Sequence, residues 1–574
     1  PTGNHFTTSG LAITDQMLDS PENNFCTLNP LHATEYLTFS EGNLKVTSSS
    51  ADWGTVAGSI GVSTGKWYWE VKVTSDLTHN RFGILEAENA GNFQLHNTAH
   101  ALGTNSLEYA YRVGDGSTYN GGTQTSGYGD TFVEGDIGAV ALDLDAGTIT
   151  FYRNGVSQGI AYSSISAGQW LPAHSVHASP EAGHYNFGQG DPDGENNFTD
   201  SNGRGGFRYE PPQGFVSLCT ANMKDTDYAP IGPNSATGTP DKHFDTLLYS
   251  GDGTTDKKIG GLAFQPDFVW IKSRSTTHSH GLFDSVRGTE GRLYSDATST
   301  EQITSGQMDS FNGDGFTVGS HVHFNTDTHN YVAWCWKAGN ETTINNDGDV
   351  QSTISVNGDA GFSIISWDNT GPSLTNYTVG HGLSQTPEMI IVKNRGKSSQ
   401  WATYHKDLTA NYYVSLNDTD DQANYSGYFP SGGVTSQTFK LGTDDDVAGQ
   451  TNGPCIAYAW HSVEGYSKFG TYKGNGNADG PFIYTGFRPA LVIFKRYNSS
   501  GSSWGLVDNK RNPHNVVGQL LYPDITAAEN TNNYCDFLAN GFKIRGTAQF
   551  QNESSGTFVY MAFAEMPFKY ANAR

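Results

Sequence analysis

The sequence contains Pro266-Asp-Phe-Val-Trp-Ile-Lys272, and the same pattern returns as Pro387-Glu-Met-Ile-Ile-Val-Lys393 and Pro489-Ala-Leu-Val-Ile-Phe-Lys495. In each copy, a lysine ends a run of apolar residues six positions after a proline. Short continuous runs of apolar, β-branched and aromatic residues are typical of strands buried on both faces. The three copies therefore predict three related β units in the C-terminal half of the chain.

Three further landmarks follow each proline at matched distances. An aromatic residue precedes a polar turn at Phe283, Trp401 and Trp504. A phenylalanine then opens a short strand 50, 52 and 53 residues after the proline, and a strand rich in large apolar residues begins 65, 68 and 69 residues after it. Four landmarks in register indicate divergent duplicates. We expect each duplicate to be a small β-sandwich of its own, joined to the next like a bead on a string.

The composition also predicts an all-β chain with several domains. Of 574 residues, 69 are glycine and 12% are aromatic, whereas only 16% are charged. Disordered chains are poor in aromatic residues, and helical bundles are rich in Ala, Leu, Glu and Lys, so both classes are excluded. Turn signals recur about every eight to twelve residues between alternating apolar stretches, which is typical of sandwiches and barrels.

The charge and the cysteines exclude several partners. The net charge of −25 opposes binding to nucleic acid and to anionic membrane surfaces, and we expect neither a nucleic-acid partner nor insertion into a membrane. No apolar stretch is long enough for a transmembrane helix, and no basic and apolar leader begins the sequence. The five cysteines are sparse and include no CxxC pair, so we interpret them as small buried side chains.

The segment from about Trp53 to Leu218 resembles a SPRY domain. The resemblance rests on alternating strands and turns at Gly65–Val71, Gly135–Asp143 and Thr148–Gly155, with later markers at Leu171-Pro172-Ala173 and Asn186-Phe187-Gly188. It implies a concanavalin-like β-sandwich that serves as an interaction module.

The region from about Phe244 to the end resembles a family of structural proteins from tailed phages of marine bacteria. The matching phrases are Tyr331-Val-Ala-Trp334 with Lys337-Ala-Gly339, Val463–Gly470, Gly480–Pro489 and the ending Ala562–Arg574. In that family, a SPRY-like domain often precedes the repeats. The resemblance implies a component of the virion, such as a tail fibre or another appendage.

These observations predict tandem β-sandwich domains with the following boundaries: an N-terminal strand or docking segment (1–50), a SPRY-like sandwich (51–218), and β repeats 1 (219–340), 2 (341–469) and 3 (470–574).

We therefore expect a non-enzymatic protein of the virion, located outside cells, that binds a host-surface glycan or envelope protein. Fibres of this kind are usually trimeric, so the resemblance implies a homotrimer or other homo-oligomer that contacts other virion proteins. Identical chains then raise the effective concentration of each shallow contact. A capsid decoration protein and a self-assembling extracellular surface filament are alternatives. A glycan depolymerase is a third, but HExxH is absent, and Asp143 and Asp145 are better explained as a solvated strand face and a hairpin turn.

Two groups of residues are candidates for ligand binding. Tyr109, Tyr111, Tyr119 and Tyr128 lie in a Gly-Ser-Thr-rich part of the SPRY-like segment, where aromatic rings suit stacking on sugars. His278 and His280, together with His321 and His323, form two His-x-His pairs in repeat 1. On a strand such a pair aims both rings the same way and suits a transition metal. We expect no other cofactor, apart from weak calcium in the acidic loops 191–195 and 345–349.

Overall fold

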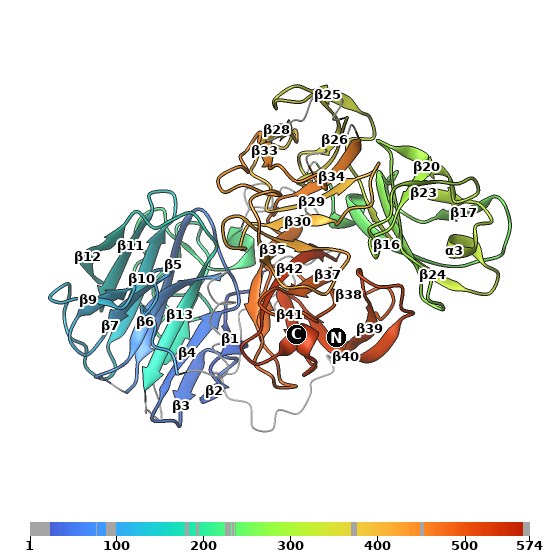
Figure 1. Ribbon diagram of the computed structural model, residues 1–574. Coiled ribbons are helices and arrows are strands. Elements are labelled where there is room, and N and C mark those ends of the chain that lie inside the picture. Colours follow the sequence, from blue (N-terminus) through green and yellow to red (C-terminus); the bar gives the residue numbers. More distant parts are fainter. Residues whose placement is uncertain are drawn as a thin grey trace, which may run out of the picture. The chain divides into compact units, whose positions relative to one another are not determined.

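The computed structural model describes residues 23–565, except 76, 88–98, 178–182, 191–193, 224–230, 232–234, 236, 369–375 and 448–452. The chain divides into two compact units, residues 1–224 with 570–574 and residues 225–569. Both are built almost entirely from strands, as the composition predicts, and they are drawn in Figure 1. Within the described residues, no helix is both long and apolar enough to cross a bilayer.

The first unit is a sandwich of two antiparallel sheets. One sheet has the order β1 (Leu28–Ala33), β4 (Trp53–Gly58), β13 (Trp170–His177), β6 (Arg81–Glu86), β7 (Glu108–Arg112), β8 (Ser117–Asn120) and β9 (Thr123–Thr125). The other has the order β12 (Val156–Ser163), β11 (Thr148–Arg153), β10 (Ile137–Asp143), β5 (Lys66–Val73), β14 (Gly183–Asn186), β3 (Lys45–Ser48) and β2 (Leu37–Ser40), with β15 (Val216–Ser217) parallel to β5. A short 3-10 helix, η2 (Thr220–Asn222), follows.

The predicted hairpin of the first unit is confirmed. β10 and β11 pair from Gly138 opposite Arg153 to Asp143 opposite Thr148, and Gly147 adopts a positive φ of 66° in the turn. Strands β1, β2 and β3 lie inside the predicted docking segment, yet they extend the two sheets of the sandwich. The segment from Leu28 to Ser48 is therefore an integral part of the first unit, because its apolar residues cover the sandwich core.

The second unit contains the three repeats, which we define by their strands: β16–β24, β25–β34 and β35–β42. Repeat 1 is preceded by η3 (Pro240–Lys242) and has β16 (Phe244–Ser250), β17 (Lys257–Gly260), β18 (Phe268–Ser273), β19 (Gly281–Asp284), β20 (Gly288–Leu293), β21 (Gln302–Ile303), β22 (Met308–Asn312), β23 (Gly315–Val318), α3 (Val322–Asn325) and β24 (Asn330–Trp336). Repeat 2 has β25 (Thr343–Asn345), β26 (Ser352–Asn357), β27 (Phe362–Asp368), β28 (Tyr377–Gly380), β29 (Met389–Asn394), β30 (Ala402–His405), β31 (Tyr412–Ser415), β32 (Ala423–Asn424), β33 (Thr438–Leu441) and β34 (Pro454–Trp460). Repeat 3 has β35 (Ser467–Lys473), β36 (Phe482–Tyr484), β37 (Pro489–Arg496), β38 (Gly505–Asp508), β39 (Val517–Leu521), β40 (Asn530–Leu538), β41 (Gly541–Ile544), α4 (Gln549–Asn552) and β42 (Thr557–Ala564).

The main sheets of the three repeats have the same order of neighbouring strands, which is not the order of these strands in the sequence. In each, the closing strand lies beside the strand that follows the landmark proline: β16-β24-β18-β19-β20, β27-β34-β29-β30-β31 and β35-β42-β37-β38-β39. The apolar runs FVWI, MIIV and LVIF are thus central strands, as their two-sided hydrophobicity predicts.

Alternate residues of each central strand enter two different cores. In β18, Val269 and Ile271 face a core that belongs to repeat 1 alone, whereas Phe268 and Trp270 enter a core shared with the other two repeats. Met389 and Ile391 of β29, and Leu491 and Ile493 of β37, enter the same shared core. The expectation of separate beads is therefore wrong, because each repeat would expose this aromatic inner face to water if it stood alone. Figure 1 shows the three sheets around their common centre, in green, yellow-orange and red.

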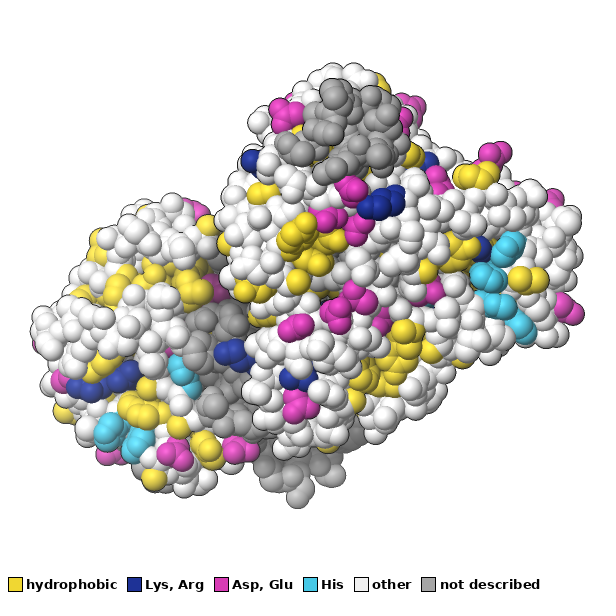
Figure 2. All heavy atoms as spheres, viewed as in Figure 1, with side chains coloured by type: hydrophobic (Ala, Val, Ile, Leu, Met, Phe, Trp, Pro, Cys, Tyr) yellow, Lys and Arg dark blue, Asp and Glu magenta, His cyan; other side chains and the backbone are white. Residues whose placement is uncertain are grey.

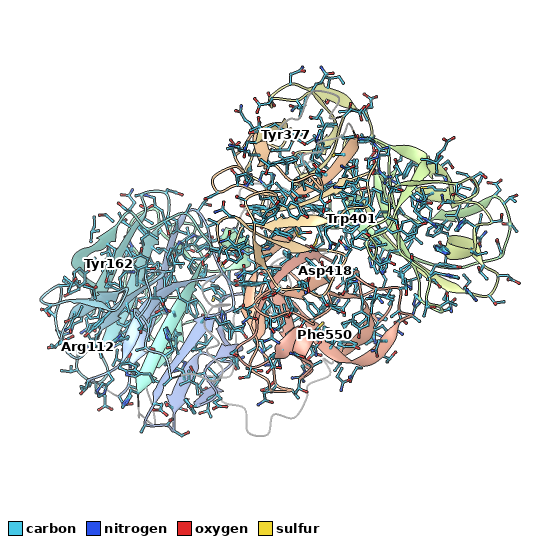
Figure 3. All side chains as sticks on the ribbon, in the orientation of Figure 1. Arg112, Tyr162, Tyr377, Trp401, Asp418 and Phe550 are labelled. Atoms are coloured by element: carbon cyan, nitrogen blue, oxygen red, sulfur yellow. The ribbon has the colours of Figure 1, made fainter. Side chains whose placement is uncertain are left out.

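Three equivalent hydrogen bonds close the repeats into a ring. In each repeat, the residue directly before β19, β30 or β38 donates a ring N–H to a backbone carbonyl of another repeat. The pairs are Trp401 with Tyr294 at 2.7 Å, Trp504 with Ser415 at 2.9 Å, and His280 with Tyr522 at 2.9 Å. Because the pairs run from repeat 2 to 1, from 3 to 2 and from 1 to 3, the chain forms a closed, pseudo-threefold ring. Figure 3 labels Trp401 at the junction of repeats 1 and 2.

Charged side chains strengthen two of the three junctions. Where repeats 1 and 2 meet, the buried Arg287 pairs with Asp284 and with Glu301, and Glu301 also pairs with Arg395 of repeat 2. Arg511, Asp508, Glu529 and Arg274 repeat this arrangement between repeats 3 and 1. At the third junction, the corresponding residues are the uncharged Leu408, Gln422 and Tyr497.

The three landmark lysines have a common structural role. Lys272, Lys393 and Lys495 are fully buried, and each donates to a carbonyl of the polar turn that follows its strand: Ser273 and Thr276, Ser399, and Ser502. Burial lowers the pKa of each lysine from 10.5 to about 8. The lysines therefore anchor the turns that carry His280, Trp401 and Trp504 to the shared core.

These lowered pKa values predict an unusual dependence of stability on pH. Between pH 8 and 10, the folded chain holds the lysines neutral while the unfolded chain still protonates them, so stability rises with pH by up to about 1.4 kcal/mol per pH unit for each lysine. Lys393→Met should remove about one third of this slope. The exposed Lys397→Met is the control and should leave the slope unchanged. Denaturant unfolding of the full chain at several pH values measures it, and equal slopes for Lys393→Met and the wild type would contradict the assignment.

Candidate binding surfaces

The four tyrosines predicted to bind ligand do not share one surface. Tyr111 is fully buried, and its ring contacts Phe82, Phe151 and Tyr128. The hydroxyls of Tyr111 and Tyr128 donate to backbone carbonyls, so both residues hold the sandwich together. The alternation of Tyr109 and Tyr111 along β7 places Tyr109 on this inner side as well.

Tyr109 is half-buried and packs against two other aromatic rings. Its ring lies 4.8 Å from that of Tyr162 and 5.3 Å from that of Trp170. Tyr162 is labelled in Figure 3 on the first unit, together with Arg112 at the end of β7. The prediction of a four-tyrosine ligand site is corrected here, because the alternation of β7 sends Tyr109 and Tyr111 inward while Tyr119 lies opposite Ala110 on the other face.

Tyr119 belongs to a separate outer cluster. The Arg81 guanidinium lies between two rings, 3.8 Å from the centroid of Tyr119 and 4.7 Å from that of Trp53. Trp53 also contacts His177 and His79, whose own rings are 4.7 Å apart. Such cation–π stacking stabilises the cluster and leaves aromatic edges at the surface. Sequence reasoning missed it because Trp53, Arg81 and His177 come from three separate strands.

A broad, shallow groove lies elsewhere on the first unit. Phe198, Tyr209, Pro211 and Pro212 supply its apolar lining, and the exposed Glu210 supplies an acidic group. Asp200 also lines the groove, but its carboxylate is buried and accepts hydrogen bonds from Ser217 and Asn222. Phe198 is 38% exposed, an unusual degree for an aromatic side chain. The positive φ of Gly155 and its missing side chain allow the Tyr209 ring to pack directly over the β11–β12 turn.

Two backbone amides and two side chains fix the groove to the sandwich through Glu70. This carboxylate is 1% exposed and accepts hydrogen bonds from the Arg208 and Tyr209 amides, the Tyr68 hydroxyl and the Asn186 amide group. Burial raises the pKa of Glu70 to about 7, against the effect of these four donors. Glu70 therefore positions the segment that forms one wall of the groove.

Repeat 2 carries a smaller cavity of about 210 Å³. Tyr404, Tyr412 and Phe429 form its aromatic lining, and Asn411 and Ser431 add polar groups. Its size and lining suit a small polar ring rather than a polymer.

The carboxylates weighed for catalysis are engaged in the β10–β11 hairpin. Asp143 pairs with Lys66 at 2.9 Å and accepts the Ala146 amide, while Asp145 accepts the Gly65 amide at 2.8 Å. Both residues thus stabilise turns.

The two predicted His-x-His pairs do not form a metal site. His280 precedes β19 instead of lying within a strand, and both its nitrogens are engaged: Nδ1 accepts from Trp270 Nε1, and Nε2 donates to Tyr522. Burial holds the pKa of His280 well below its usual value, so its ring is neutral. Among the described residues, no three His, Cys, Asp or Glu side chains form a group able to hold a metal ion.

The remaining predicted histidines gather on the surface of repeat 1. His278 stacks on His323 with the ring centroids 4.6 Å apart, and His321 lies 5.0 Å from His323. His329 lies 6.4 Å from His278. Figure 2 shows the resulting stripe of histidine side chains, in cyan, on the repeat 1 end of the second unit. We call these four residues the histidine patch.

The acidic loops proposed for calcium are only partly described. Residues 191–193 lie outside the described residues. In the other loop, Asn345 and Asp347 bond to each other, and Asp349 accepts the amide and hydroxyl of Thr378. These contacts are those of a hydrogen-bonded turn. All five cysteines are free and buried, which confirms their interpretation as small core side chains.

Comparison with known families identifies both units. A family model described as a domain of unknown function, DUF7483, matches residues 239–567, more than half of the chain. The chain belongs to the DUF7483 family. The matched region spans all three repeats, in agreement with their single shared core, and we call residues 225–569 the DUF7483 unit. A SPRY domain model matches residues 66–190, which confirms the SPRY resemblance of the first unit.

Curated relatives of this DUF7483 protein match about a quarter of its length. Ran-binding protein 9 of Xenopus tropicalis is 28% identical over 169 residues, which are 28% of this chain and 30% of the relative. The human Ran-binding protein 9 is 27% identical over 169 residues, which are 28% of this chain and 22% of the relative. The chain thus spans less than a third of the length of these relatives.

Solved structures match over the same share of the chain. The SPRY domain of human HERC1 is 21% identical, with 28% of this chain and 94% of that chain covered and a TM-score of 0.24. The TRIM65 PSpry domain is 15% identical, with 28% and 92% covered and a TM-score of 0.23.

Proposed function

We propose that this protein is a non-enzymatic virion component, a phage tail fibre or other appendage, that attaches to the host cell surface through its SPRY unit. The main support is the SPRY domain itself, since domains of this type generally serve in recognition of other proteins. The resemblance of the repeats to structural proteins of tailed phages supports the location on a virion. The DUF7483 unit then serves as a stiff support, because its three repeats share one core.

The groove beside Phe198 is the proposed contact surface. The exposed Phe198 ring and the half-buried Tyr209 favour burial against a partner, and the exposed Glu210 gives orientation. An extended segment of a host envelope protein fits this lining better than a sugar does, because the groove is broad and partly apolar. In oligomers, several weak contacts of this kind reinforce one another.

A binding assay with labelled full-length protein and host cells tests this proposal. Phe198→Ser should weaken cell binding about ten-fold, the usual effect of removing an aromatic anchor. Val133→Ser, which replaces another exposed apolar residue of the same unit, should leave binding unchanged. Equal binding by wild type and Phe198→Ser would reject the groove.

Imaging and chemistry test the rest of the proposal. Gold-labelled antibodies against the chain should mark the tail of intact phage particles, whereas labelling over the shell would favour a capsid decoration protein.

Incubation of the protein with purified host envelope should leave the length of the envelope polysaccharides unchanged. Release of oligosaccharides would overturn the non-enzymatic assignment.

A further inference from the structure

The histidine patch presents hydrogen-bond donors rather than metal ligands. His321 Nδ1 accepts the His323 amide at 3.2 Å, and His323 Nδ1 lies 3.2 Å from Arg292 Nη1, which can only donate. Each neutral ring therefore carries its proton on Nε2. Among the described residues, neither Nε2 has a hydrogen-bond partner, so both N–H groups are available to a ligand.

A buried cation lies directly behind these rings. Arg292 is only 4% exposed, and its guanidinium lies over the rings of Tyr294 and Phe324, at 4.2 and 5.2 Å. Its Nε has no hydrogen-bond partner, and no carboxylate of the described residues forms an ion pair with it. Buried arginines are normally paired, so this charge is under-compensated.

The other charges near the patch leave an excess of positive charge. The positive charge of Lys272 lowers the pKa of His278 and of His323. The negative charge of Asp296 interacts favourably with both Lys272 and Arg292. One half-buried carboxylate thus faces two cations. Burial, followed by the Arg292 charge, lowers the pKa of His321 and of His323 to about 4, so both rings are neutral donors at pH 7.

We propose that the histidine patch is an oxyanion-binding site, in which the Nε2–H groups of His321 and His323 hold a sulfate or carboxylate group in the field of Arg292. Two outward N–H groups in front of an uncompensated cation match an acceptor that carries negative charge. A metal ion requires free lone pairs on Nε2, which this hydrogen bonding removes. On a chain with a net charge of −25, an anionic ligand is repelled from most of the surface, so local positive charge decides where it binds. The site does not depend on the host-attachment role of the SPRY unit.

Asparagine substitutions distinguish the role of Nδ1 in each ring from the role of Nε2. Asparagine at positions 321 and 323 keeps an acceptor where Nδ1 stands, for the His323 amide and for Arg292, but its shorter side chain places no N–H at the position of Nε2. The double variant His321→Asn/His323→Asn should therefore fold like the wild type. Thermal unfolding of both chains checks this. His514→Asn, at an exposed histidine of repeat 3, is the matched control.

The test is a titration of the full-length chain, labelled with ¹⁵N-histidine, with sodium sulfate and in a parallel arm with sodium acetate, at pH 7 and constant ionic strength. The Nε2 signals of His321 and His323 should shift and saturate, with a dissociation constant on the order of millimolar. The double variant should bind at least ten-fold more weakly, and the His514→Asn chain should bind as tightly as the wild type. The arm with the tighter binding identifies the oxyanion. Non-saturating shifts in both arms, or unchanged affinity in the double variant, would overturn the proposal. If the double variant fails to fold, His321→Asn alone should still weaken binding, and unchanged affinity there would overturn it equally.

Discussion

Arg287→Met should lower the free energy of unfolding of the DUF7483 unit by about 3–5 kcal/mol, the cost of removing one partner from a buried ion pair. Arg287 and Asp284 have fully buried side chains, and Asp284 also accepts the Tyr458 hydroxyl of repeat 2 at 2.7 Å. Without Arg287, the Asp284 charge is left buried at the junction of repeats 1 and 2. Urea unfolding of the full-length chain, followed by circular dichroism, measures the change.

The chain offers a matched control for this substitution. Leu408 occupies the position of Arg287 in repeat 2, three residues after the end of β30. His405 and Gln422 stand where repeat 1 has Asp284 and Glu301, so this position lacks the buried ion pairs. Leu408→Met creates the same side chain at an apolar junction and should cost about 1 kcal/mol or less. Equal stabilities of Arg287→Met and Leu408→Met would show that the ion pairs do not hold the ring together.

Glu70→Ala should destabilise the SPRY unit by at least about 3 kcal/mol, because it removes the acceptor of four hydrogen bonds, two of them buried and two partly buried. Glu70→Gln should recover most of this loss. Burial already raises the pKa of Glu70 to about 7, so the site tolerates a neutral side chain, and glutamine keeps one acceptor oxygen. Thermal unfolding of the three chains ranks them, and an alanine variant as stable as the glutamine variant would refute the role of Glu70.

Glu70 also links stability to binding. The segment from Arg208 to Tyr209 is fixed by this carboxylate, and Tyr209 lines the groove proposed to contact the host. At a temperature where Glu70→Ala remains folded, this variant should therefore bind cells more weakly than the wild type, as Phe198→Ser does. Full binding by a folded Glu70→Ala chain would separate the groove from Glu70.

Local patterns in the sequence predicted the strands well. The apolar run after each landmark proline became a central strand, and the Asp143–Thr148 hairpin formed as its turn residues indicate. Both features depend on residues close together in the chain, whose spacing reports the period of a strand.

The ring itself could not be predicted, since its contacts join residues that are distant in sequence. The sequence pattern aligns Phe283 with Trp401 and Trp504, whereas the structure places His280 at the equivalent position. A histidine can replace tryptophan here because both rings donate one N–H to a carbonyl. The apolar inner faces gave no signal either, because a strand buried against its own repeat has the same sequence pattern as one buried against a neighbour.

The candidate sites were missed for a related reason. Identification of Tyr109 to Tyr128 as one surface assumed that loop aromatics face solvent, whereas strand alternation sends two of them inward. The metal interpretation assumed that each His-x-His pair lies on a strand, but His321 caps the short helix α3. Trimer formation remains a prediction, and the pseudo-threefold ring shows that a single chain already brings three related sheets together.

Hydrogen–deuterium exchange of the full-length wild type and Arg287→Met tests the central claim most directly, namely that the three repeats form one cooperative ring. The substitution lies in repeat 1, so the claim predicts that protection falls by the same free energy in β24, β34 and β42, the closing strands of all three repeats. A loss of protection confined to β24 and its neighbours in repeat 1, with β42 unchanged, would contradict it and restore the model of independent beads.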